Sequence, residues 1–147
     1  MNFDFRDCLT EYHSHGVSFS YPGQWTLEEQ QDGNDVLLTV SVGNTCFWLL
    51  RILPECPPPP QVVDSCVRGF REEYEDVEVE KTEDKLAEMP AVARDLQFFC
   101  LELVNSAALR SVRTSTATLL VWWQGTDHEL RDVQEQFRFI TSSVRFT

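Results

Sequence analysis

Residues 16–25 have the sequence GVSFSYPGQW, in which apolar and small polar side chains alternate before a Pro-Gly pair. Val17, Phe19 and Tyr21 fall on one side of an extended chain because side chains alternate faces along a β-strand. Proline followed by glycine is typical of the turn that ends such a strand. The stretch therefore predicts a half-buried strand and a turn, with Trp25 just beyond it.

Two more strands are predicted at residues 36–42 and 46–53, which are rich in branched and aromatic side chains. Residues 43–45, Gly-Asn-Thr, would join them as a hairpin. The second of these strands is apolar on both faces, so we expect it near the middle of the sheet. The segment 25–31 fits either a short strand or a turn.

Four consecutive prolines at 57–60 interrupt the sheet, because proline cannot donate a ladder hydrogen bond. They indicate an extended spacer, or alternatively a ligand for an aromatic groove of another domain. Beyond them, apolar residues at spacings of four, three and four predict an amphipathic helix with Pro60 in its first turn. These apolar residues are Val63, Val67, Phe70 and Tyr74.

The second half of the chain predicts further strands. Valine alternates with acidic residues over 77–80, which indicates a strand with one acidic face and suits a sheet edge. Residues 91–104 and 113–123 read as two long strands, and residues 105–109 as the turn between them.

A helix is predicted from Thr126 onward, since Thr126 and Glu129 form a capping box sequence. Apolar residues then repeat at helical spacing, and residues 142–146 predict a short last strand. The apolar residues of this helix are Leu130, Val133, Phe137 and Ile140.

Length and charge exclude several classes of protein. The 147 residues fit one domain, which we expect over residues 1–147, and no apolar run approaches the roughly 18 residues of a membrane helix. The net charge of −12 repels phosphate, so we expect no nucleic-acid partner and no membrane partner. Five scattered cysteines and a charged N-terminal stretch favour reduced thiols, no signal peptide and a cytoplasmic location.

Both ends of the chain carry a family pattern. GVSFSYPGQW at 16–25, together with Phe-x-x-Ile-x-x-Ser-Val-x-Phe at 137–146, resembles the PsbP-like and DcrB-like proteins. The resemblance implies a fold of the α/β (α+β) class, a single-domain α/β/α sandwich with a mainly antiparallel sheet flanked by helices. That fold is shared with the Ran-release nuclear-transport factor, which binds a small GTPase. The resemblance therefore implies binding or assembly rather than catalysis.

An acidic stretch is the first candidate contact surface. Residues 72–88 hold nine acidic residues and two lysines, a net charge of −7. Glu78, Glu80 and Asp84 would share a strand face and attract a basic partner or a hard cation. The alternative is a solvated edge that keeps the protein unpaired.

Trp122 and Trp123 are a second candidate, because neighbouring residues of a strand point to opposite faces. An exposed indole at a strand end would anchor a protein partner, whereas helices on both sides of the sheet would bury both rings.

Glu11, His13 and His15 are the candidate metal ligands, since alternate residues of a first strand share a face. The stretch lacks a recognisable fourth ligand, and exposed polar alternation explains it equally well.

No catalytic motif or phosphate-binding loop is present, and the sequence implies no cofactor. We therefore expect a non-enzymatic protein-binding or assembly-supporting module. The alternative is a small-molecule or metal carrier with a pocket between sheet and helix, and an unrecognised hydrolase is a third reading.

Overall fold

The computed structural model describes residues 4–43 and 45–147. A 3-10 turn, η1 (Phe5–Asp7), precedes the strands, and the two helices are α1 (Pro59–Glu73) and α2 (Asp127–Ser143). In chain order the strands are β1 (Leu9–Ser14), β2 (Val17–Pro22), β3 (Thr26–Asp32), β4 (Asp35–Ser41), β5 (Phe47–Leu53), β6 (Glu78–Leu86), β7 (Met89–Cys100), β8 (Leu103–Arg113), β9 (Thr118–Thr126) and β10 (Arg145–Phe146).

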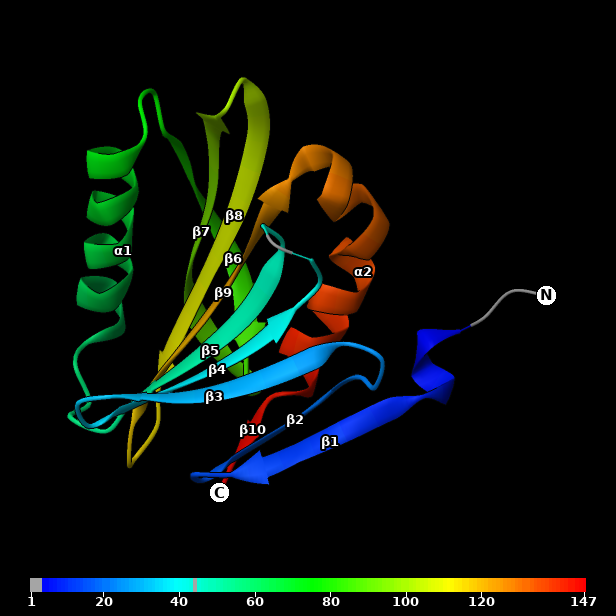
Figure 1. The fold of residues 1–147 in the computed structure, drawn as a ribbon. Coiled ribbons are helices and arrows are strands. Elements are labelled where there is room, and N and C mark those ends of the chain that lie inside the picture. Colours follow the sequence, from blue (N-terminus) through cyan, green and yellow to red (C-terminus); the bar gives the residue numbers. More distant parts are fainter. Residues whose placement is uncertain (1–3, 44) are drawn as a thin grey trace.

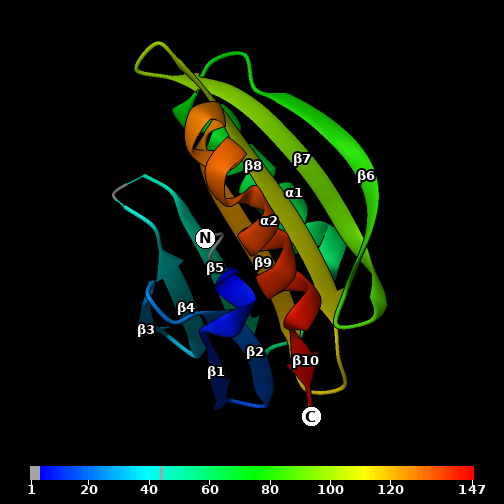
Figure 2. The same ribbon diagram turned by 90° about the vertical axis from the view of Figure 1, so that its right-hand side faces the viewer.

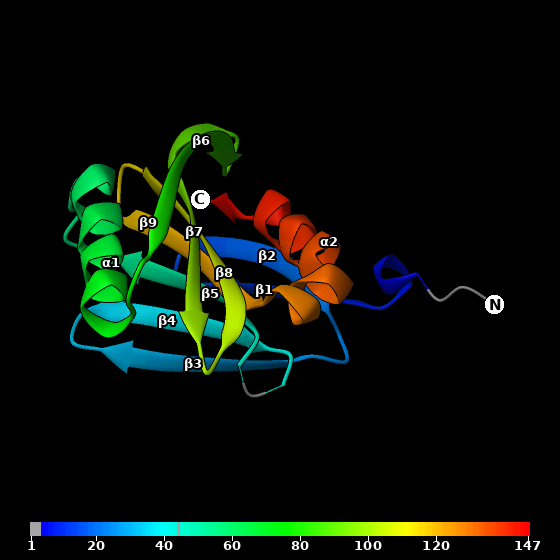
Figure 3. The ribbon, with the colours of Figure 1, turned by 90° about the horizontal axis from the view of Figure 1, so that it is seen from above.

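The strands form two antiparallel sheets. The large sheet has the order β3-β4-β5-β9-β8-β7-β6, and the small sheet has the order β1-β2-β10. Helix α1 packs on one face of the large sheet against β7, β8 and β9, whereas α2 and the small sheet cover the other face (Figures 1 and 2). Seen from above, the large sheet lies between the two helices (Figure 3). The predicted α/β/α sandwich with a mainly antiparallel sheet is confirmed.

The two ends of the chain meet in the core on the α2 side. Phe19 of β2 lies 5.0 Å from the ring of Trp48, whose Nε1 donates a 2.9 Å hydrogen bond to Thr141 Oγ1 of α2. Trp25 packs edge-on against Phe137 at 5.7 Å. Because Phe137 and Trp48 are fully buried, α2 is fixed on the sheet by both apolar contact and a hydrogen bond.

The start of α2 has the predicted capping box. The Glu129 N–H donates to Thr126 Oγ1 at 3.1 Å, and the Thr126 N–H donates to Glu129 Oε1 at 2.9 Å. The Thr45 hydroxyl also donates to the Glu129 carboxylate, which ties the β4–β5 connection to the helix. Asn44 of the predicted hairpin turn lies outside the described residues.

Helix α1 begins at Pro59, so Pro60 lies in its first turn as predicted. Pro58, just before the helix, has φ −59° and ψ 132°, and the Thr118 hydroxyl donates to the Pro57 carbonyl. The segment left open between a strand and a turn is strand β3. Neither helix in the described residues is long and apolar enough to cross a membrane.

The predicted turn at residues 105–109 is wrong. These residues are the middle of β8, and the turn consists of Leu101 and Glu102, whose φ angles are 53° and 66°. Asn105 is buried in the sheet, where its side-chain amide donates to the Leu103 carbonyl. Pairing with β7 and β9 on both sides outweighs the turn preference of Asn105, and two residues with positive φ complete a tight hairpin.

Candidate functional site

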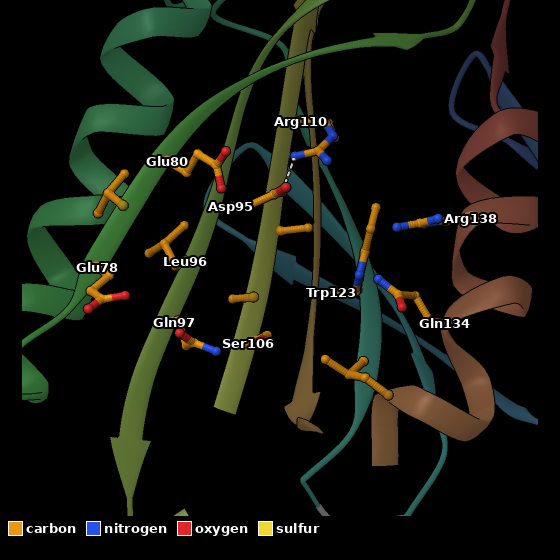
Figure 4. Close-up of a pocket in the computed structure, with 14 residues that line it drawn as sticks. Glu78, Glu80, Asp95, Leu96, Gln97, Ser106, Arg110, Trp123, Gln134 and Arg138 are labelled. Atoms are coloured by element: carbon orange, nitrogen blue, oxygen red, sulfur yellow. Dashed lines mark ion pairs between the residues drawn. The ribbon is translucent and has the colours of Figure 1, made fainter. Parts of the chain in front are cut away.

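A groove lies between α2 and the strands β6, β7 and β8, at the edge of the large sheet (Figure 4). It consists of a hollow of about 420 Å³ and an adjoining one of about 370 Å³. Both hollows are lined by Asp95, Arg110, Trp123 and Arg138. On the large sheet, helix α2 packs mainly on β9 and makes smaller contacts with β8 and β6, so the groove is a consequence of where the helix crosses the sheet.

Arg110 is the buried centre of the groove, with its side chain only 7% exposed. Its Nε donates to Asp84 Oδ2 at 2.7 Å, and its Nη1 donates to the backbone carbonyls of Leu109 and Arg94. Asp95 Oδ1 lies 2.9 Å from Nη1 but outside hydrogen-bonding geometry. Two carboxylates therefore neutralise one buried guanidinium and fix its position.

Trp123 and Arg138 complete the wall opposite the acidic strand. The Trp123 ring is 5% exposed and lies 5.4 Å from the Arg110 guanidinium, within the range of a cation–π contact. Arg138 projects from α2 toward the sheet, is exposed, and forms no ion pair with any described residue (Figure 4). The groove thus has one buried, neutralised cation and one exposed cation.

The predicted acidic surface borders this groove. Glu78 and Glu80 line the larger hollow and Asp84 lines the adjoining one, so all three lie on the same face of β6. The predicted position at a sheet edge is confirmed. Asp84 holds Arg110, whereas Glu78 and Glu80 are exposed and form no ion pair within residues 4–43 and 45–147. Glu78 and Glu80 are thus the two carboxylates of the three that have no ion-pair partner among the described residues.

The two predicted tryptophans point to opposite faces of β9, as alternation requires. Trp123 lies on the α2 side in the groove, and half-buried Trp122 lies on the α1 side against Phe47 and Phe70. The Trp122 Nε1 donates to Gln124 Oε1 at 2.9 Å. Both indoles are therefore mostly covered. This agrees with the alternative in which helices on both sides of the sheet bury the rings, and not with an exposed indole that anchors a partner.

Among the described residues, the most exposed large apolar side chains are ones that the sequence pattern does not mark as a site. Phe99, Leu101 and Leu103 lie at the tip of the β7–β8 hairpin and are 59%, 90% and 55% exposed. The misplaced turn concealed them, because it put all three inside a strand. Glu102, the single charged residue between Phe98 and Val104, is the signal that could have located the turn.

Phe99 continues the floor of the groove, whereas Leu103 pairs with Cys100 and therefore lies on the α1 face of the hairpin. Cross-strand pairs that share one face of the sheet run from Asp95↔Ala108 through Gln97↔Ser106 to Phe99↔Val104. The first two pairs line the larger hollow. The same face therefore changes from charged at Arg110 to apolar at the hairpin tip.

The structure does not bring Glu11, His13 and His15 together as a ligand set. Strand β1 ends at Ser14, so the expectation that His15 lies on the strand is wrong; it lies in the following turn with φ 53°. Its Nε2 is 3.3 Å from Glu29 Oε2 on β3. Among the described residues, no three His, Cys, Asp or Glu side chains form a group able to hold a metal ion.

Glu29 also binds the neighbouring tyrosine. The Tyr12 hydroxyl donates to Glu29 Oε1, and this hydrogen bond, followed by that from His15, lowers the pKa of Glu29. Burial and the same Glu29 contact raise the pKa of Tyr12 to about 12. The cluster is explained by the attachment of β1 to β3.

Comparison with known proteins identifies the fold. No protein-family model and no curated protein sequence matches the chain. Cyanobacterial PsbP (CyanoP) from Synechocystis is similar in structure, with a TM-score of 0.58, 14% identity, and 95% of this chain and 93% of that chain covered.

Two further solved structures are similar at 13% identity. LpqN of Mycobacterium tuberculosis, involved in cell envelope biogenesis, has a TM-score of 0.53 and covers 97% of this chain and 94% of its own. PA94 of Pseudomonas aeruginosa, of unknown function, has a TM-score of 0.52, and the match covers 89% of this chain and 92% of that chain. The fold is therefore PsbP-like, as the residues at both ends of the chain predicted, and no specific role follows from it.

Proposed function

We propose that the chain is a non-enzymatic protein-binding or assembly-supporting module whose contact surface is the charged groove together with the β7–β8 hairpin tip. The observation that carries the proposal is the exposure of Phe99, Leu101 and Leu103 at one tip. Phe99 and Leu103 lie on opposite faces of the hairpin, so exposed apolar side chains surround its tip. Exposed apolar residues clustered in this way, with polar residues around them, are typical of protein interaction sites. The residue anchoring such a site lies near its centre, which is Leu101 here.

Charge supports a basic protein partner. Glu78 and Glu80 are unpaired in the described structure and border the groove, within a stretch of net charge −7. Carboxylates around an apolar anchor speed the approach of a basic surface and repel nucleic acid and anionic membranes. We propose the cytoplasm as the location, since Cys8, Cys46, Cys56, Cys66 and Cys100 are all free thiols.

The chemistry of the groove supports binding over catalysis. Neither histidine nor cysteine lines the two hollows. Ser106 is the one serine of the larger hollow, and its hydroxyl donates to Asp127 Oδ1 at 2.7 Å rather than to a basic nitrogen. A serine nucleophile needs an adjacent base, so this arrangement favours a structural role for Ser106.

The proposal is tested by site-specific photo-crosslinking in the native cell lysate. A benzoylphenylalanine at position 101 is compared with one at Gln30, an exposed residue of β3 at the opposite edge of the sheet. We expect a discrete adduct at 101 only, weakened by high salt and by E78K/E80K. Equal adducts at both positions, or none at 101, would contradict the proposal.

A second candidate function, a small-molecule carrier with a pocket between sheet and helix, is favoured by a different observation. An apolar hollow of about 340 Å³ lies between α1 and the strands β4, β5 and β9. It contains neither His13 nor His15, so these side chains do not contribute to it.

A further inference from the structure

The apolar hollow lies on the α1 side of the large sheet, opposite the groove. Helix α1 packs over β7, β8 and β9, so its flank forms one wall and the side chains of β4 and β5 form the floor. The floor and wall consist of Leu37, Leu49, Leu53, Val62, Leu120 and Trp122, with Arg51, Gln61, Ser65 and Cys66 among them.

The floor is apolar where an exposed sheet face would be polar. Leu37 and Leu49 are only half-buried. On the same face, the neighbouring strand β3 presents exposed Gln30 opposite Leu37 and exposed Glu28 opposite Thr39. Since antiparallel sheets facing water show polar residues on that face, the leucines indicate a site that is covered by something apolar.

The guanidinium and the indole N–H in the hollow already have partners. Arg51 donates from Nε and Nη2 to Asp35 at 2.9 and 2.7 Å, and from Nη2 to Asp32 at 3.0 Å. The Trp122 Nε1 donates to Gln124. Two carboxylates more than balance the one guanidinium, so an anionic ligand meets no net positive charge here.

The cysteine in the wall is also uncharged. Cys66 lies on α1, and burial raises the pKa of its thiol. A neutral thiol behaves as a small apolar side chain in such a site. The surface of the hollow is therefore mostly apolar, and it carries no net positive charge.

We propose that this hollow binds one small, neutral, apolar molecule of aromatic or short acyl type. Its volume of about 340 Å³ falls at the lower end of the range of ligand pockets, roughly 300–1,000 Å³. Because the large sheet separates it from the groove, the ligand and a protein partner can bind at the same time. The inference thus rests on the second candidate function, the small-molecule carrier, and is independent of the proposed protein-binding function.

Titration with the neutral fluorescent probe N-phenyl-1-naphthylamine tests the site. We expect saturable binding of one probe per chain, and at least tenfold weaker binding of the anionic relative anilinonaphthalene sulfonate. S65W, at an exposed position that lines the hollow, should weaken probe binding at least tenfold. E72W is the matched control, because Glu72 is exposed on the same helix outside the hollow.

A second readout does not depend on fluorescence. Peptide-resolved alkylation with N-ethylmaleimide should show Cys66 protected by the probe, and exposed Cys8 unprotected. L49R places a charge in the floor and should abolish both signals, with circular dichroism confirming that the variant is folded. Non-saturable binding, equal affinity for the anionic probe, or equal effects of S65W and E72W would overturn the proposal.

Self-association through the hollow is another result that would contradict the proposed ligand site. If a second copy fills the hollow with its Leu101, light scattering will show a concentration-dependent mass that is lost in both S65W and L101S. The probe would then bind L101S more tightly than the wild type, and the hollow would be an interface between copies.

Discussion

Two regions of the molecule both contain large apolar side chains but differ in how far these are buried. At the corner where β2, β5 and α2 meet, Phe19, Trp48 and Phe137 are fully buried. At the β7–β8 tip, neighbouring Phe98 and Phe99 are 1% and 59% exposed. Large apolar residues occur in both, so what separates the core from the proposed contact surface is whether another element crosses the strands.

The position of α2 creates this difference. Ser106 of β8 donates to Asp127, the first residue of α2, so the hairpin beyond Ser106 extends past the start of the helix (Figure 1). The corner residues Phe19, Trp48 and Phe137, in contrast to the hairpin tip, lie at the last two turns of α2. A substitution at the corner should therefore reduce stability, whereas one at the tip should reduce binding.

F137A should have the largest effect on stability. Phe137 is fully buried and contacts Trp25, so removing its ring leaves a cavity and should lower the free energy of unfolding by about 3–5 kcal/mol. Urea denaturation followed by circular dichroism measures the loss. A loss below about 1 kcal/mol would mean that α2 is not held at this corner.

R110M should have the next largest effect, because Asp84 and Asp95 would lose their shared cation. Both carboxylates are about half exposed, so water relieves part of the cost, and we expect a loss of about 1–3 kcal/mol. R138M is the matched control in the same groove and should change the free energy of unfolding by less than about 0.5 kcal/mol. Equal losses of unfolding free energy in both variants would show that the buried position of Arg110 does not contribute to stability.

T126A removes the hydroxyl that accepts the Glu129 N–H at the start of α2. We expect a loss of about 1 kcal/mol, as is usual for a helix N-cap, measured by the same denaturation. The variant should unfold at a lower urea concentration, while the proposed contact surface at the β7–β8 tip stays intact. An unchanged midpoint would contradict the role assigned to the capping box.

The capping box also makes a small part of the stability pH-dependent. Burial opposes ionisation of Glu129, but hydrogen bonds from the Thr126 N–H and from the Thr45 and Thr126 hydroxyls outweigh it and lower the pKa of Glu129. A lowered pKa adds stability that is complete above the unfolded value of about 4.3 and is lost as pH falls through the folded value. Urea midpoints of wild type and E129Q should therefore differ at pH 7 and converge toward pH 3.

The corner was predictable from the sequence because its signals are local. Strand alternation at Phe19, the capping box at Thr126 and the helical spacing of Phe137 and Ile140 each agree with the final packing. The acidic edge at Glu78 and Glu80 was predictable for the same reason. Local preference and tertiary packing favour the same structure in these segments.

The tip and the groove were not predictable in this way. Asn105 prefers a turn but is buried in β8, while Leu101 and Glu102, neither a typical turn residue, form the turn. Pairing of β8 with its two neighbouring strands determines where the turn lies, and the sequence of one segment does not reveal which strands it pairs with. Likewise, the position of α2 rather than any motif brings Arg138 opposite Asp95 and Arg110.

L101S should have the smallest effect on stability and the largest on binding. Leu101 is 90% exposed, so its removal should change the free energy of unfolding by less than about 0.5 kcal/mol. In the photo-crosslinking assay, now with benzoylphenylalanine at Leu103, the adduct should fall at least tenfold relative to the unsubstituted tip. F137A should show the opposite behaviour, a large loss of stability without a loss of binding. At a temperature where F137A remains folded, the photo-crosslinked adduct should form as in the wild type. If L101S destabilised the chain while leaving the adduct unchanged, the tip would be part of the core, and the distinction between the two apolar regions would fail.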